Sequence, residues 1–359
     1  MPRCKADPSI KRVEVDGFKF PLGVYPVEEM TPRAGYTVMF EAADGGEDAE
    51  GNTEWEEWPD RYVFDIVAPA DRVEALCRML FSLMPGRIYP ILDVLGQDAY
   101  REIDPYISYD LLGTDRFLEI VRECRDLFFD DGMIGFGAMS EDPFFYVFVD
   151  EHKIVTVRAQ PELKERIEKI LAAFDLEEMT DPAGADSAAH EHRGVLISDR
   201  SPEGLRFDEL VESLKDEWRL LLNVDSEKNV DEDGKELGIT AWRIVVRFDP
   251  DDEGVPSTYV EVALAAPNLR EAEENAVDAA ARLLADVSPE SHIPVIVVAD
   301  RLSREQLSDL LKSAATRRRP RPKRPKDRSE ADEPFVPDPA PAETGELKAG
   351  QIWLARTLS

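Results

Sequence analysis

The chain has 359 residues and 43% of them are hydrophobic, so it is long enough to form two domains that each bury a core. Its formal net charge is −32, from 75 acidic and 43 basic residues, and this charge disfavours binding of the bulk surface to nucleic acid or to an anionic membrane. The same acidity is typical of adaptation to high salt, and the composition leaves that alternative open.

The sequence carries no membrane or disulfide signal. Its longest apolar runs, such as 293–299, are too short to span a bilayer, and residues 1–11 lack an apolar leader, so we predict a cytoplasmic protein with a flexible N-terminus. Cys4, Cys77 and Cys124 are odd in number and widely spaced, which argues against a disulfide framework or a zinc knuckle. We expect Cys77 and Cys124 to be buried thiols on apolar helix faces.

The first predicted domain covers residues 12–178 and contains an acidic loop at 44–60. Residues 61–95 read as a strand, an amphipathic helix and a strand, and the crossover is right-handed if the two strands are parallel neighbours. The later elements are a helix that begins at Thr114, three short strands at 133–139, 144–149 and 154–158, and a helix that begins at Pro161.

Residues 179–193 are rich in Ala, Asp, Gly and His without periodicity, which predicts an interdomain linker before a second domain at 194–315. Two later helices begin with a capping-box pattern. The expected elements are a strand at 195–198, a helix at 207–218, a hairpin of 220–224 with 239–248, a strand at 259–265, a helix after Asn268, a strand at 293–299 and a helix after Ser303.

These elements predict an α+β protein. We expect two sandwich-like α/β-plait domains of the ferredoxin-like type, with mixed and largely antiparallel sheets, followed by a disordered C-terminal tail. Both domains contain a β-α-β unit, which reflects either an ancient duplication or a unit that α+β domains commonly share.

The tail at 316–345 consists mainly of proline, charged and small residues, first basic and then acidic, so it cannot bury a core. The following segment, 346–359, recovers apolar character, and we expect residues 350–354 to add as a strand to a sheet edge, in this chain or in a partner. The basic stretch 317–328 has a net charge of +7, and its candidate partner contacts are Arg317, Arg318, Arg319, Arg321, Lys323, Arg324 and Lys326.

Three segments resemble functional motifs without completing them. Residues 229–240 resemble a calcium loop but lack the ligands at both ends, which favours a hydrated hairpin. His190 and His192 alternate as metal ligands can, with Asp186 nearby, but a metal site needs three or four positioned ligands. The segment 150–153 (Asp-Glu-His-Lys) reads as a polar hairpin tip, with general acid–base chemistry as the alternative.

Glycines at 132, 135 and 137 do not form a phosphate loop, because no Lys-Ser/Thr follows them, and instead indicate a bulge or a close approach of backbone. Trp55 and Trp58 lie in the acidic loop, where they either dock a basic or proline-rich partner or fold back onto a sheet edge. Trp353 is a further candidate contact in the terminal segment.

Because no catalytic constellation is visible, we expect a non-enzymatic interaction protein that presents an acidic surface and a flexible tail to a protein partner with a basic surface. We expect no cofactor and no metal site. One alternative is a nucleic-acid accessory protein that acts through residues 317–328. Another is a hydrolase or transferase whose site is assembled from scattered carboxylates.

Overall fold

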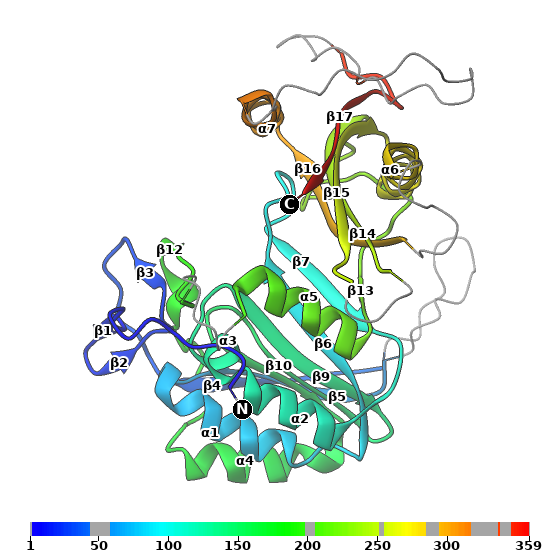
Figure 1. The fold of residues 1–359 in the computed structure, drawn as a ribbon. Helices are drawn as coiled ribbons and strands as arrows, with labels where there is room; N and C mark the ends of the chain where they lie inside the picture. The colour runs from blue at the N-terminus through cyan, green and yellow to red at the C-terminus, as the bar shows by residue number, and fades with distance from the viewer. Residues whose placement is uncertain are drawn as a thin grey trace, which may run out of the picture. The chain divides into compact units, whose positions relative to one another are not determined.

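The computed structural model describes residues 2–43, 58–197, 205–250, 255–284, 294–316, 337 and 346–358. They form an α+β protein, as predicted, which divides into two compact units. Unit 1 contains Met1–Leu95 and Ile103–Asn223, and unit 2 contains Gly96–Glu102 and Val224–Ser359 (Figure 1). No described helix is both long enough and apolar enough to cross a membrane.

Unit 1 is built on a nine-stranded sheet, and all ladders between its named strands are antiparallel. We expected α/β-plait domains of the ferredoxin-like type with mixed, largely antiparallel sheets, and that detail is not confirmed. The order is β13 (Leu220–Leu222), β7 (Ile103–Ser108), β6 (Arg87–Leu95), β9 (Ile134–Glu141), β10 (Phe144–Val149), β11 (Val155–Ala159), β5 (Arg61–Val67) and β4 (Gly35–Glu41), while β8 (Leu112–Gly113) pairs with β6.

The predicted β-α-β unit is present as β5, α1 (Ala70–Phe81) and β6, but its two strands are not neighbours. The hairpin-linked strands β9, β10 and β11 lie between them. Unit 2 repeats this pattern with one inserted strand, because β14 (Thr240–Phe248) separates β15 (Thr258–Ala266) from β16 (Pro294–Leu302).

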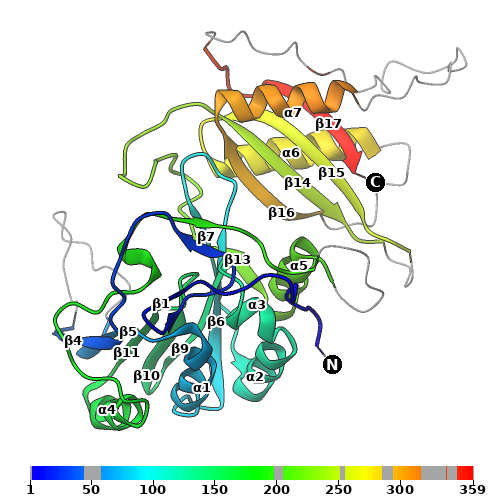
Figure 2. The ribbon, with the colours of Figure 1, turned by 90° about the vertical axis from the view of Figure 1, so that its left-hand side faces the viewer.

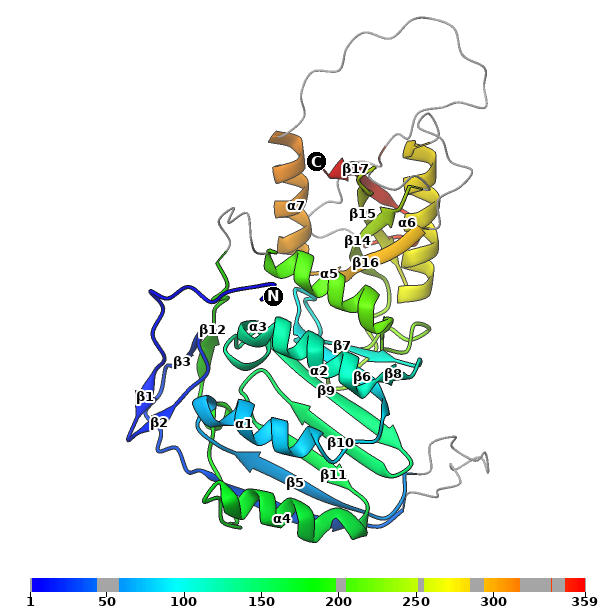
Figure 3. The same cartoon turned by 60° about the horizontal axis from the view of Figure 1, so that its bottom comes forward.

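Helices cover one face of the unit 1 sheet (Figure 3). They bury the side chains of alternate strand positions, such as Phe145, Val147 and Val149 of β10, which are 0% exposed. The helices are α1, α2 (Thr114–Glu123), α3 (Arg125–Phe129), α4 (Lys164–Ala173) and α5 (Phe207–Trp218), and α4 follows a 3-10 turn at Pro161–Leu163 as predicted.

The helix at 207–218 forms as expected, but it belongs to unit 1. Trp218 is 1% exposed and packs its ring 5.0 Å from that of Phe117 and 5.6 Å from that of Phe128. The strand after it, β13, pairs with β7 instead of forming the predicted hairpin with residues 239–248. An amphipathic pattern fixes which face of a helix is buried, but not which core receives it.

The segment predicted as a linker lies inside unit 1. Within it, β12 (His190–His192) pairs with β3 (Val24–Pro26), next to the short hairpin of β1 (Glu14–Val15) and β2 (Phe18–Lys19) and after a 3-10 turn at Ala185–Ser187. The boundary between the units falls at 223/224 instead.

The N-terminal residues are also packed, contrary to the flexible segment we expected at 1–11. Cys4 is 6% exposed, and Arg3 forms salt bridges with Glu123 and Glu217. The thiols of Cys77 and Cys124 are buried as predicted, at 0% exposure.

Unit 2 is a four-stranded antiparallel sheet in the order β16-β14-β15-β17, with α6 (Leu269–Leu284) and α7 (Arg304–Thr316) on opposite faces (Figure 2). The capping box that begins α7 is reciprocal, since Ser303 and Gln306 each accept the other's backbone N–H. The C-terminal strand β17 (Ile352–Leu358) pairs with β15, so the expected strand addition occurs within this chain.

Glycines in β9 allow an aromatic ring to lie against the strand. A methyl group on Gly135 would stand 2.8 Å from the ring of Phe148, and one on Gly137 would overlap the carbonyl oxygen of Val147. The predicted close approach at these glycines is therefore present, and it holds β9 against β10.

We expect Gly137→Ala to lower the free energy of unfolding by about 1–3 kcal/mol, because backbone atoms must move to admit the methyl group. Gly86→Ala is the control, since nothing lies within 4 Å of its new carbon, and should change stability by less than about 0.5 kcal/mol. Urea denaturation of both variants checks this, and equal stabilities would contradict the packing argument.

Candidate metal site

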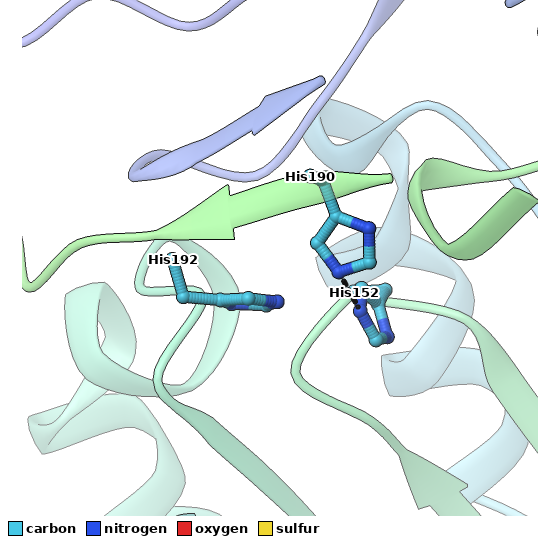
Figure 4. Close-up of side chains that lie close together, drawn as sticks. All are labelled: His152, His190 and His192. Carbon is cyan, nitrogen blue, oxygen red and sulfur yellow. Dashed lines mark hydrogen bonds between the residues drawn. The ribbon is translucent and has the colours of Figure 1, made fainter. Parts of the chain in front are cut away.

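Three of the four histidines of the chain meet at one end of the unit 1 sheet. They are His152, His190 and His192, and their ligand atoms all lie within 4.8 Å of one another (Figure 4). The fourth, His292, lies outside the described residues. Each of the three is partly buried, and the side chain of His152 is 13% exposed.

Two different elements supply these imidazoles. His190 and His192 are two residues apart on β12, so their side chains leave the same face of that strand. His152 lies in the turn that joins β10 to β11. The pairing of β12 with β3, in which His192 is opposite Val24, places the strand across this turn.

Backbone carbonyls orient the two imidazoles of β12. Nδ1 of His190 lies 2.7 Å from the carbonyl oxygen of Ala188, and Nδ1 of His192 lies 2.6 Å from that of Gly132. A carbonyl oxygen can only accept a hydrogen bond, so both Nδ1 atoms carry the proton and donate it. In the neutral rings the lone pair is therefore on Nε2, which is the tautomer that outer hydrogen bonds select in metal-ligating histidines.

The third imidazole faces carboxylates on one side and His190 on the other. Nδ1 of His152 lies 3.4 Å from Asp150 and 3.3 Å from Glu151, while its Nε2 lies 2.8 Å from Nε2 of His190. Two lone pairs at that separation repel each other, so the contact requires either a proton on one of these Nε2 atoms or a cation between the rings.

The pKa values of His152 and His192 are shifted in opposite directions. Burial opposes the charged form of His152, but Asp150, Glu151 and Asp186 together outweigh it and raise the pKa of this imidazole. Burial lowers the pKa of His192, and the neighbouring imidazoles and Lys153 act in the same direction. A neutral imidazole is the form that binds a metal.

The turn at 131–133 carries the carbonyl oxygen of Gly132, which accepts the hydrogen bond from Nδ1 of His192. The carboxylate of Asp131 is fully buried and accepts the backbone N–H of Met133 at 2.9 Å, and burial raises its pKa to about 6. A methyl group on Gly132 would overlap the side chain of Val24, so only glycine lets this turn approach β3 and direct its carbonyl to His192. This is the structural role of the first of the three glycines noted in the sequence.

A buried lysine supports the other side of the cluster. Lys153 follows His152 with a positive φ of 64°, is 1% exposed, and donates to the carbonyl oxygen of Ile134 at 2.7 Å. Burial lowers the pKa of its ammonium to about 8. Lys153 therefore fixes the β10–β11 turn to the start of β9, although the sequence indicated only a polar hairpin tip there.

The three Nε2 atoms suit a transition metal. Imidazole ligands bind Zn, Cu, Fe and Ni. A tetrahedral zinc ion with Zn–N distances near 2.05 Å separates its nitrogens by about 3.3 Å, against 2.8 Å between His152 and His190. For this pair, metal binding would require the two rings to move apart by about half an ångström, and one of them lies in a turn. The nitrogen of His192 lies within 4.8 Å of the other two, so it would have to approach the ion as well.

The partner contacts predicted from the sequence lie elsewhere. Trp58 packs edge-on against Phe144 at 5.2 Å, with the guanidinium groups of Arg61 and Arg158 over its ring. Trp353 is 4% exposed within β17. Trp55 lies outside the described residues, as do the basic positions Arg317, Arg318, Arg319, Arg321, Lys323, Arg324 and Lys326.

The segment that resembles a calcium loop forms a hairpin turn. Asp231 and Lys235 hydrogen-bond across it, and Asn229 donates to Gly238 and Thr240. Among the described residues, no metal-ligating cluster occurs there.

Sequence reasoning considered His190 and His192 together but placed them in a linker, and it considered His152 separately. No spacing rule connects positions 38 residues apart. The available signal was the rarity of histidine, since only four occur in the chain and three of them lie in polar segments that we singled out.

A partly buried carboxyl group, that of Asp93, lies on β6 near the same turn. Burial, with smaller contributions from Glu151 and Asp150, raises the pKa of Asp93 from 3.8 to about 7. The folded state thus holds the proton more tightly than the unfolded state, so this group favours folding below pH 3.8, and the benefit is lost as the pH rises towards 7.

We therefore expect Asp93→Asn to be more stable than the wild type, by a margin that grows by about 1–3 kcal/mol between pH 5 and pH 8. Urea denaturation at the two pH values measures the margin. A difference in stability that does not change with pH would contradict the raised pKa.

No protein-family model matches the chain, and neither a curated protein nor a solved structure shows significant similarity to it.

Proposed function

We propose that this protein binds one divalent transition-metal ion of the zinc class through His152, His190 and His192. The observation that supports the proposal is the convergence of three imidazoles from two segments. Each Nδ1 faces an acceptor of its own, so the Nε2 atoms are the ones left for a metal.

The competing interpretation is a purely structural cluster held by a shared proton. A protonated His152 would donate to His190 and satisfy the 2.8 Å contact without any metal. That arrangement leaves Nε2 of His192 without a hydrogen-bond partner among the described residues. Metal binding uses all three Nε2 atoms, which is why we prefer it.

A bound ion would join β12 to the turn between β10 and β11, and so would link two parts of unit 1 that are distant in sequence. Its binding free energy would therefore add to the stability of the folded state. In this proposal the first role of the metal is to fix the segment 179–197 onto the end of the sheet.

The interaction function expected from the sequence remains a prediction, because the basic tail lies outside the described residues. The nucleic-acid accessory function and the scattered-carboxylate site likewise remain predictions.

Zinc binding should be measurable on the full chain. We expect one Zn²⁺ per chain in isothermal titration calorimetry, and a melting temperature higher by about 5–10 °C at a free Zn²⁺ concentration of 100 times Kd. Chelation with EDTA should reverse the shift in melting temperature.

Single substitutions identify the ligands. His152→Ala, His190→Ala and His192→Ala should each weaken zinc binding by more than the roughly 10–100-fold that loss of an outer partner costs. His292→Ala is the matched control, because it removes the one histidine that is not a ligand in our proposal, and should bind zinc as the wild type does. Equal loss in all four variants, or no zinc binding by the wild type, would refute the proposal.

A further inference from the structure

The number of protein ligands at the histidine cluster has a consequence for its chemistry. We propose that the metal held there keeps one coordination position for an exogenous ligand, namely water or a small monodentate anion. This inference rests on the proposed metal binding and concerns what the bound ion can do.

The number of protein ligands supports an open coordination position. Zinc sites that are closed use four protein ligands, whereas sites that bind and activate a ligand use three and leave the fourth position to water. Among the described residues, the His152, His190 and His192 group contains no fourth ligating side chain. The three thiols of the chain are buried and do not belong to the group.

The nearby carboxylates of Asp150 and Glu151 do not fill that position. Asp150 and Glu151 form a second group with His152, but they face its Nδ1 atom. A metal on Nε2 lies on the other side of that ring, so these carboxylates act as outer partners that hold the imidazole and strengthen it as a ligand. They cannot fill the fourth position without giving up that contact.

The charge of the ion and the exposure of the three rings to solvent also favour an exogenous ligand. Three neutral imidazoles leave the full charge of a divalent ion in place, which favours water, hydroxide or an anion as the fourth ligand. All three rings are partly exposed to solvent, so a small molecule can reach them.

Asp186 is the one side chain that offers a closed alternative. It is exposed, precedes β12 by a few residues, and acts electrostatically on His152. Its carboxylate is outside the group of ligand atoms, and it accepts a hydrogen bond from Ser187 at 3.3 Å. A movement of this loop could bring it to the metal, so the experiment must test it directly.

The experiment loads the full chain with CoCl₂, because Co²⁺ occupies zinc-type sites and its visible absorption reports coordination number and ligand exchange. Sodium azide is then titrated into the cobalt-loaded wild type and into Asp186→Asn. We expect a saturable change in the visible spectrum in both proteins, reversed when azide is removed by dialysis.

The outcomes separate this inference from the metal site itself. Failure of the wild type to bind Co²⁺ would refute the site and with it the open position. A cobalt-loaded wild type that does not respond to azide would leave the site intact and overturn the open position. If Asp186→Asn then responds, Asp186 is the fourth ligand and the site is closed.

Discussion

The antiparallel pairing of β12 with β3 is the interaction on which the candidate site depends. Backbone hydrogen bonds between these strands hold His190 and His192 across the end of the unit 1 sheet. Residues 179–193 have the composition of a linker, and this pairing is what makes positions 190–192 a strand. The site therefore results from backbone bonding between segments more than 160 residues apart, and not from any local motif.

Burial explains why so many groups around the cluster have shifted pKa values. Asp131 and Lys153 are almost completely removed from water, and each finds hydrogen-bond partners in the backbone of neighbouring turns. Such groups are costly to bury unless they are satisfied, so the turns that they join are held in one arrangement. That rigidity positions the carbonyl oxygen of Gly132 and the ring of His152, which are the outer partner and the third ligand in our proposal.

The acidic residues of the chain have two different roles. The excess of acidic over basic residues gives the net charge of −32. A few, such as Asp150, Glu151 and Asp186, lie near the histidines and favour positive charge there. They would favour a bound cation for the same electrostatic reason that they favour a protonated imidazole. The predicted electrostatic partner of the whole surface is a separate matter and remains a prediction.

The sequence by itself determined the class of fold and many of the helices and strands. Periodic apolar positions located α1, α4 and α5, alternation located β9 to β11, and the capping pattern at Ser303 located the start of α7, because these features depend on neighbours within a few residues. It also showed close chain approach at the glycines of β9. Only the tertiary structure decided that α5 packs in unit 1, that residues 190–192 form a strand, and that three histidines meet. The physical reason is that strand pairing and core packing join residues distant in sequence, and the local pattern of each segment does not specify its partner.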